Sequence, residues 1–285
     1  MEDAFLKLDI KSDSVFKYIF LSEIGKNYMC NILSKLINIK YKDLIDNMYI
    51  INSEYPRIGN KSSYSDVVYR YKNIIFIIEM NNFYTKKSIY KNHYYLFFNH
   101  IYNANNKNNY NKDIITYLID IDNFDIAEKI KIDIKKEFVY KSELLIDKSI
   151  SSFYPNIKTI RINLDYLNKI KYNYNTLKDI ERDCLIFVEN NKQILNKQIK
   201  NKDIKEVMEM FEIMEIDGKF YAMYDKEKYE EAIREEIKEN ALEEGKIEGK
   251  NEERFIIAKS LKQLNIPINN IVKSTGLTIE EINTL

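Results

Sequence analysis

The residues whose types and spacing best suit chemistry are two carboxylates, Asp66 and Glu79. They bracket the stretch D-V-V-Y-R-Y-K-N-I-I-F-I-I-E, in which β-branched and aromatic residues favour a strand on each side of the polar pair Lys72-Asn73. If these strands pair as a hairpin, the start of the first lies beside the end of the second, and the carboxylates meet at one end of a sheet. Carboxylates crowded together repel each other unless a cation lies between them, and oxygen ligands suit Mg²⁺ or Mn²⁺. An isolated acidic residue beside a strand is usually a solubility residue, so it is the pair that indicates a metal site.

The same stretch resembles the active-site hairpin of PD-(D/E)xK nucleases, in which an Asp on one strand is followed by Glu-x-Lys on the next. It is similar in particular to the Rpn-type branch of recombination-promoting nucleases and putative transposases, which usually reads Glu-x-Gln. Here the residues are Glu79-Met80-Asn81. The resemblance continues through residues 84–90 and reaches back to residues 11–17, so that it covers roughly residues 1–165.

This resemblance implies a metal-dependent DNA endonuclease that hydrolyses phosphodiester bonds and is associated with recombination, transposition or mobile-element defence. Asp66 and Glu79 would hold Mg²⁺ or Mn²⁺ together with the backbone carbonyl of Met80, while Asn81 would occupy the position of the usual Lys. Because an asparagine can hydrogen-bond a water molecule but carries no charge, Lys87 in the next helix is a candidate for the missing positive charge. A catalytically weakened nuclease fold that acts as a DNA-binding or protein-assembly module stays open as the alternative.

The elements that must position this site read as an α/β fold. Helices are predicted early in the chain and over residues 84–102, and strands over residues 48–51, the hairpin and three later segments. These later strand segments are residues 113–121, 138–140 and 157–164. This order predicts a restriction-endonuclease-like core with a mixed central sheet flanked by helices. Asp13 precedes the first helix and has two interpretations, a helix N-cap or an accessory acidic group near the metal.

The helix over residues 84–102 carries an aromatic stripe. Its apolar residues recur at the spacing of one broad helical face, and they are Tyr90, Tyr94, Phe97, Phe98 and Ile101. We expect this face to pack into the core rather than to serve as a base-stacking surface.

Composition limits the remaining classes of function. The formal net charge is zero, so affinity for DNA must come from a local basic patch. No apolar run approaches the length of a membrane span, and the start of the chain lacks the features of a secretory signal. Cys30 and Cys184 stand alone, without the spacing of a zinc site. A cytoplasmic, reduced protein that does not bind membranes is the simplest interpretation.

The composition shifts near Asn168 and predicts three regions. They are the part that the resemblance implies is nuclease-like (1–168), a helical extension with a long charged helix (169–254) and a small helical hairpin (255–285). The segment 225–254 is crowded with Glu and Lys and has only a thin apolar stripe, which is typical of a solvated helix or a coiled-coil seam. We therefore expect the C-terminal helices to support association, with a homo-oligomer as one outcome. Thr278-Ile279-Glu280-Glu281 has the pattern of a helix-capping box.

Overall fold

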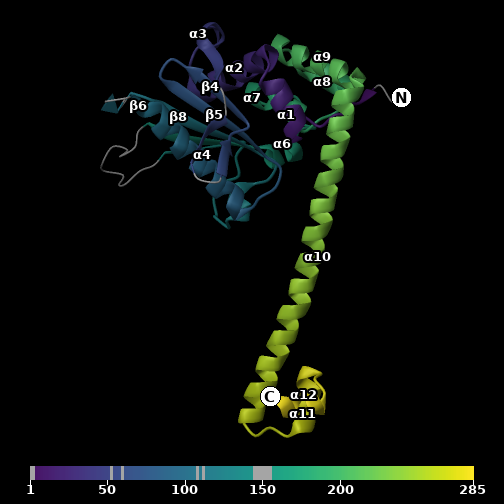
Figure 1. Ribbon diagram of the computed structural model, residues 1–285. Helices are drawn as coiled ribbons and strands as arrows, with labels where there is room; N and C mark the ends of the chain where they lie inside the picture. Colours follow the sequence, from purple (N-terminus) through teal and green to yellow (C-terminus); the bar gives the residue numbers. More distant parts are fainter. Residues whose placement is uncertain (1–3, 52–53, 59–60, 107–108, 111–112, 144–155) are drawn as a thin grey trace. The chain divides into compact units, whose positions relative to one another are not determined.

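The computed structural model describes residues 4–51, 54–58, 61–106, 109–110, 113–143 and 156–285, and it confirms the predicted α/β class (Figure 1). In chain order the elements are α1 (Asp13–Phe20), α2 (Glu23–Ile37), α3 (Tyr41–Asn47), β1 (Met48–Ile51), β2 (Glu54–Ile58), β3 (Lys61–Tyr64), β4 (Val67–Tyr71), β5 (Ile74–Asn81), α4 (Lys86–Ala104), β6 (Asn105–Asn106), β7 (Asn109–Tyr110), β8 (Ile115–Asp122), α5 (Ile126–Lys129), β9 (Val139–Glu143), β10 (Ile157–Asn163), α6 (Leu164–Ile170), α7 (Asp179–Asp183), the 3-10 helix η2 (Leu185–Phe187), α8 (Lys192–Gln198), α9 (Lys202–Ile216), α10 (Gly218–Gln263), α11 (Ile268–Thr275) and α12 (Ile279–Thr284).

The central sheet has six strands in the order β1-β4-β5-β8-β10-β9. The three strands β5, β8 and β10 run parallel to one another, whereas β1, β4 and β9 pair antiparallel to their neighbours. The predicted mixed sheet is therefore confirmed. The apolar run of residues 74–78 lies in β5, an interior strand covered on both faces, and this position explains why it does not alternate with polar residues.

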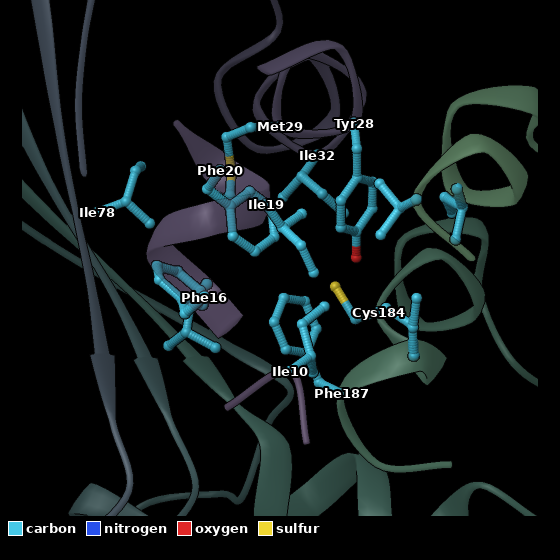
Figure 2. Packing of buried hydrophobic residues seen from close by; sticks show 14 of the residues in the cluster. Ile10, Phe16, Ile19, Phe20, Tyr28, Met29, Ile32, Ile78, Cys184 and Phe187 are labelled. Atoms are coloured by element: carbon cyan, nitrogen blue, oxygen red, sulfur yellow. The ribbon is translucent and has the colours of Figure 1, made fainter. Parts of the chain in front are cut away.

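The two faces of β5 meet different layers, because successive side chains of a strand point to opposite faces. Phe76 and Ile78 join the larger core, in which the sheet packs against the N-terminal helices and the helices after β10. Figure 2 shows this core, where aromatic side chains from α1, α2 and η2 gather and those of α1 lie on the side of Ile78. Ile75 and Ile77 face the other way and pack with Leu96 of α4, and α4 lies along β5 and β8 (Figure 1). Strand alternation therefore places the carboxylate of Glu79 on the α4 side.

The orientation of α4 differs from the sequence-based expectation. The aromatic stripe was expected in the core, and this prediction is wrong because Tyr90, Tyr94 and Phe97 are exposed. The buried face of α4 includes Asn92 and Asn99 instead. Asn92 faces polar side chains at the ends of β5 and β8, which need hydrogen-bond partners, and Asn99 donates to the Tyr95 carbonyl of α4 itself.

The chain divides into two compact units, residues 1–224 and 225–285. In the first unit α7 and α9 pack on α2, so these helices, which composition groups with the extension, share the core of the sheet. In the second unit α11 and α12 pack on the last turns of α10 through Ala258, Ile271, Leu277 and Ile282. The capping box of Thr278 and Glu281 is confirmed at the start of α12. Among the described residues, no helix combines the length and apolar character that a membrane crossing requires.

Candidate active site

The β4–β5 hairpin places the two predicted carboxylates side by side. Tyr71 pairs with Ile74 across a two-residue turn, and Val67 pairs with Ile78 at the open end. Lys72 in the turn has a φ of 53°, the left-handed conformation that tight hairpins require. Asp66 directly precedes β4, so this register brings it opposite Glu79.

Backbone hydrogen bonds hold the two side chains in this arrangement. The Asp66 N–H donates to Glu79 Oε1 at 3.2 Å, and the Met80 N–H donates to Asp66 Oδ2 at 2.9 Å. Each carboxylate thus binds the strand that carries the other. Strand register sets the relative position of the two residues, and these bonds to backbone N–H groups orient their carboxylates.

Burial makes ionisation of both carboxylates unfavourable. Burial raises the pKa of Glu79 well above its ordinary value, and the neighbouring charge of Asp66 raises it further. Burial also raises the pKa of Asp66, against the opposing effects of the Lys17 ammonium and the Met80 N–H. Lys17 Nζ lies 3.5 Å from Asp66 Oδ1, and Lys91 Nζ lies 3.7 Å from Glu79 Oε2. Each carboxylate of the pair therefore has one lysine ammonium as an ion-pair partner.

The lysine beside the carboxylates is not the one that the sequence suggested. Lys87 is exposed in the first turn of α4, whereas Lys91, one turn later, approaches Glu79. The spacing of four residues places both lysines on neighbouring positions of one helical face, so their spacing alone does not show which one reaches the strand end. Lys17 in α1 was also missed, because its contact with Asp66 joins residues far apart in the sequence.

Asn81 shares its strand face with Glu79 because it follows two residues later in β5, and its amide bonds to protein groups. Its Nδ2 donates to Asp120 Oδ1 at 3.1 Å and to Asp122 Oδ1 at 2.9 Å, and its Oδ1 accepts a hydrogen bond from Asn92 Nδ2 at 3.0 Å. Asn92 also donates to Asp120 Oδ1 at 2.7 Å. Asn81 thus joins the hairpin to the next parallel strand and to α4.

Arg161 of β10 supplies the positive charge of this network. Its Nη2 lies 2.7 Å from Asp120 Oδ2, and its Nη1 lies 2.7 Å from Asp122 Oδ2. Burial raises the pKa of Asp122 to about 7, the charge of Asp120 adds to this effect, and Arg161 opposes it. Asp120, Asp122 and Arg161 were not predicted as site residues, although Asp120 and Asp122 in the I-D-I-D end of an apolar strand were a usable signal.

Asp13 lies in the first turn of α1, and Ser12 occupies the N-cap position. The N-cap interpretation of Asp13 is therefore wrong. Its carboxylate pairs with Lys17 at 2.7 Å, and the same ammonium reaches Asp66. Asp13 is thus linked to the carboxylate pair through a shared lysine.

The chemistry of the donor set fits a hard divalent cation. Asp66 and Glu79 offer carboxylate oxygens whose nearest ammonium groups are 3.5 and 3.7 Å away, and two buried like charges favour a cation between them. Among the described residues, no three His, Cys, Asp or Glu side chains gather as a metal-binding group. An ion held here would take its other ligands from backbone, water or substrate phosphate, as Mg²⁺ commonly does.

Comparisons with known proteins agree with this geometry. A family model described as PD-(D/E)XK nuclease family transposase matches residues 10–240. Comparisons of the chain with curated proteins and with solved structures give no match. The matched range includes the hairpin, α4 and all three parallel strands that carry the site.

Proposed function

The chain belongs to the PD-(D/E)XK nuclease family transposases, and on this basis we propose that it is a metal-dependent endonuclease that hydrolyses phosphodiester bonds in DNA. The observation that carries the proposal is the reciprocal backbone bonding of Asp66 and Glu79 at the open end of the β4–β5 hairpin. It supports a preformed pair of oxygen ligands whose unfavourable burial a cation would relieve.

Asp66, Glu79 and the carbonyl of Met80 would hold Mg²⁺ or Mn²⁺. When bound, such an ion lowers the pKa of a water molecule and withdraws charge from a phosphate oxygen. Lys91 places an ammonium 3.7 Å from Glu79, where it would attract the scissile phosphate and stabilise negative charge that develops on it. Lys17 would act in the same way on the Asp66 side, with Asp13 keeping its ammonium in position.

The hydrogen bonds of Asn81 favour a positioning role for this residue. Its amide hydrogen bonds to Asp120 and Asp122 fix the end of β5, two residues after Glu79. The same hydrogen bonds of the Asn81 amide support the alternative function, because an amide that bonds to protein groups is less available to orient a water molecule for hydrolysis. The alternative is a weakened nuclease fold that binds DNA or a partner protein.

The deciding experiment uses Asp66→Asn and Glu79→Gln, which keep side-chain shape and remove charge. Purified variants and parent are incubated with Mg²⁺ and supercoiled plasmid, and the nicking rate is measured. Loss of the metal's contribution, several kcal/mol, should slow nicking on the order of a thousandfold. Asp165→Asn is the matched control, since that carboxylate pairs only with the exposed Lys169 among the described residues. Nicking at the parent rate by either site variant, with an unchanged circular dichroism spectrum, would exclude the assignment.

A further inference from the structure

The outward face of α4 exposes a row of rings, which we call the α4 outer row. Its members are the exposed Tyr90, Tyr94, Phe97 and Tyr102, with the half-buried Phe98 between them. Tyr90 is 74% exposed and Tyr94 50% exposed. Tyr94 stacks on Phe98 with ring centroids 6.0 Å apart, and Phe98 stacks on Tyr102 at 6.2 Å. An exposed apolar surface of this kind usually marks a binding site.

The charge of the same helix limits what can bind. Over its 19 residues α4 carries Lys86, Lys87 and Lys91 and has no Asp or Glu, although acidic and basic residues balance over the whole chain. Lys86 and Lys87 are exposed at the start of the helix. The row therefore lies beside a local excess of positive charge, which attracts a polyanion.

The row is continuous with the proposed active site. Lys91 lies beside Tyr90 in sequence, its Nζ is 3.7 Å from Glu79 Oε2, and it also lies 5.2 Å from the centre of the Tyr95 ring. From Tyr90 to Tyr102 the helix rises about 18 Å. A nucleic-acid strand with a phosphate beside the exposed Lys91 ammonium would therefore have the row next to it along α4.

We propose that the α4 outer row stacks the unpaired bases of single-stranded DNA, with the lysines at the helix start binding the adjacent phosphates. This inference rests on the proposed nuclease function and specifies its substrate, a strand that is single or locally unpaired beside the cleaved bond. Rings that stack on bases, combined with a basic groove, are the usual means of binding single strands without sequence preference. Paired bases inside a duplex cannot present their faces to the row.

The test measures binding separately from cleavage. Fluorescence anisotropy follows a fluorescein-labelled 20-nucleotide oligo(dT) in EDTA, where metal-dependent cleavage cannot occur. The Tyr90→Leu, Tyr94→Leu double variant keeps apolar bulk but loses two rings, and its affinity should fall at least about tenfold. Tyr90→Phe, Tyr94→Phe should bind like the parent, because the rings remain. Tyr172→Leu is the matched control, since Tyr172 is 69% exposed and lies beside Lys171, and its affinity should not change.

Because binding and cleavage are measured separately, failure of the stacking proposal can be told apart from failure of the proposed nuclease function. The inference is overturned if the parent does not bind oligo(dT), or if the leucine double variant binds it as tightly as the parent. It is also overturned if that variant loses mass in light scattering while its oligo(dT) affinity is unchanged, because the row would then join copies of the chain. Plasmid nicking by the parent is measured in parallel, and its absence would count against nuclease activity and not against the stacking result. Circular dichroism and thermal melting verify that the variants fold, which substitution at exposed positions should permit.

Discussion

Lys91, and not Lys87, should provide the positive charge that assists cleavage. At 3.7 Å and an effective dielectric constant of about 20, one charge pair interacts by about 4 kcal/mol. The Lys91 side chain is 49% exposed, so solvent screening reduces this figure. We expect about 1–3 kcal/mol to remain for stabilising a phosphate at the same place, equivalent to a rate change on the order of tenfold to a hundredfold.

The assay is single-turnover nicking in Mg²⁺ as a function of pH. Lys91→Ala should be slower by the stated factor, Lys91→Arg should largely keep the parent rate, and Lys87→Ala, one helical turn away, should stay within about twofold of it. A second readout follows from electrostatics, because the Lys91 ammonium opposes the rise in the pKa of Glu79. Its removal should raise that pKa and move the acid limb of the pH–rate profile to higher pH. A slow Lys87→Ala beside a parent-like Lys91→Ala would refute the reasoning.

Further predictions concern stability and association. Arg161→Met should lower the free energy of unfolding at pH 8 by about 3–5 kcal/mol, because it removes the positive charge beside two buried carboxylates. The control Lys169→Met breaks an exposed ion pair and should lower it by less than about 1 kcal/mol. Equal losses for the two variants in urea titrations would contradict this prediction. The folded pKa of Asp122, about 7, exceeds its ordinary value of 3.8, so its contribution to stability is complete below pH 3.8 and is lost as the pH rises through 7. In EDTA the melting temperature should therefore fall over this range, and Asp122→Asn should flatten the fall; an identical pH dependence in that variant would argue against it. Removal of residues 225–285, a separate compact unit, should lower the mass in light scattering and keep Mg²⁺-dependent nicking, whereas an unchanged mass would show that association does not involve this unit.

Much of the fold was predictable because its causes are local. Hydrophobic and β-branched runs indicated the strands, and the order of helices and strands indicated a mixed sheet between helices. The pairing of Asp66 with Glu79 was predictable for the same reason. A short turn allows one antiparallel register, and that register brings the two ends of the hairpin together.

The rest of the site joins segments that are distant in the sequence. Asp120 meets Asn81 because β8 runs parallel beside β5, and Arg161 meets Asp120 because β10 runs parallel beside β8. Parallel neighbours can be separated by any long crossover. Periodicity showed that α4 has an aromatic face but did not show which face of the helix would pack against the sheet. Because the polar ends of the parallel strands need hydrogen-bond partners, Asn92 turns inward and Tyr94 outward.

The local pattern of residues was therefore sufficient for the strand elements, the hairpin and its carboxylate pair, since short-range sterics and hydrophobic alternation act within a few residues. The choice of Lys91 over Lys87, the buried charge network around Arg161 and the exposure of the α4 outer row required the folded chain. These features depend on which buried polar groups of the sheet still need hydrogen-bond or charge partners. Such partners come from segments that only the tertiary structure brings together.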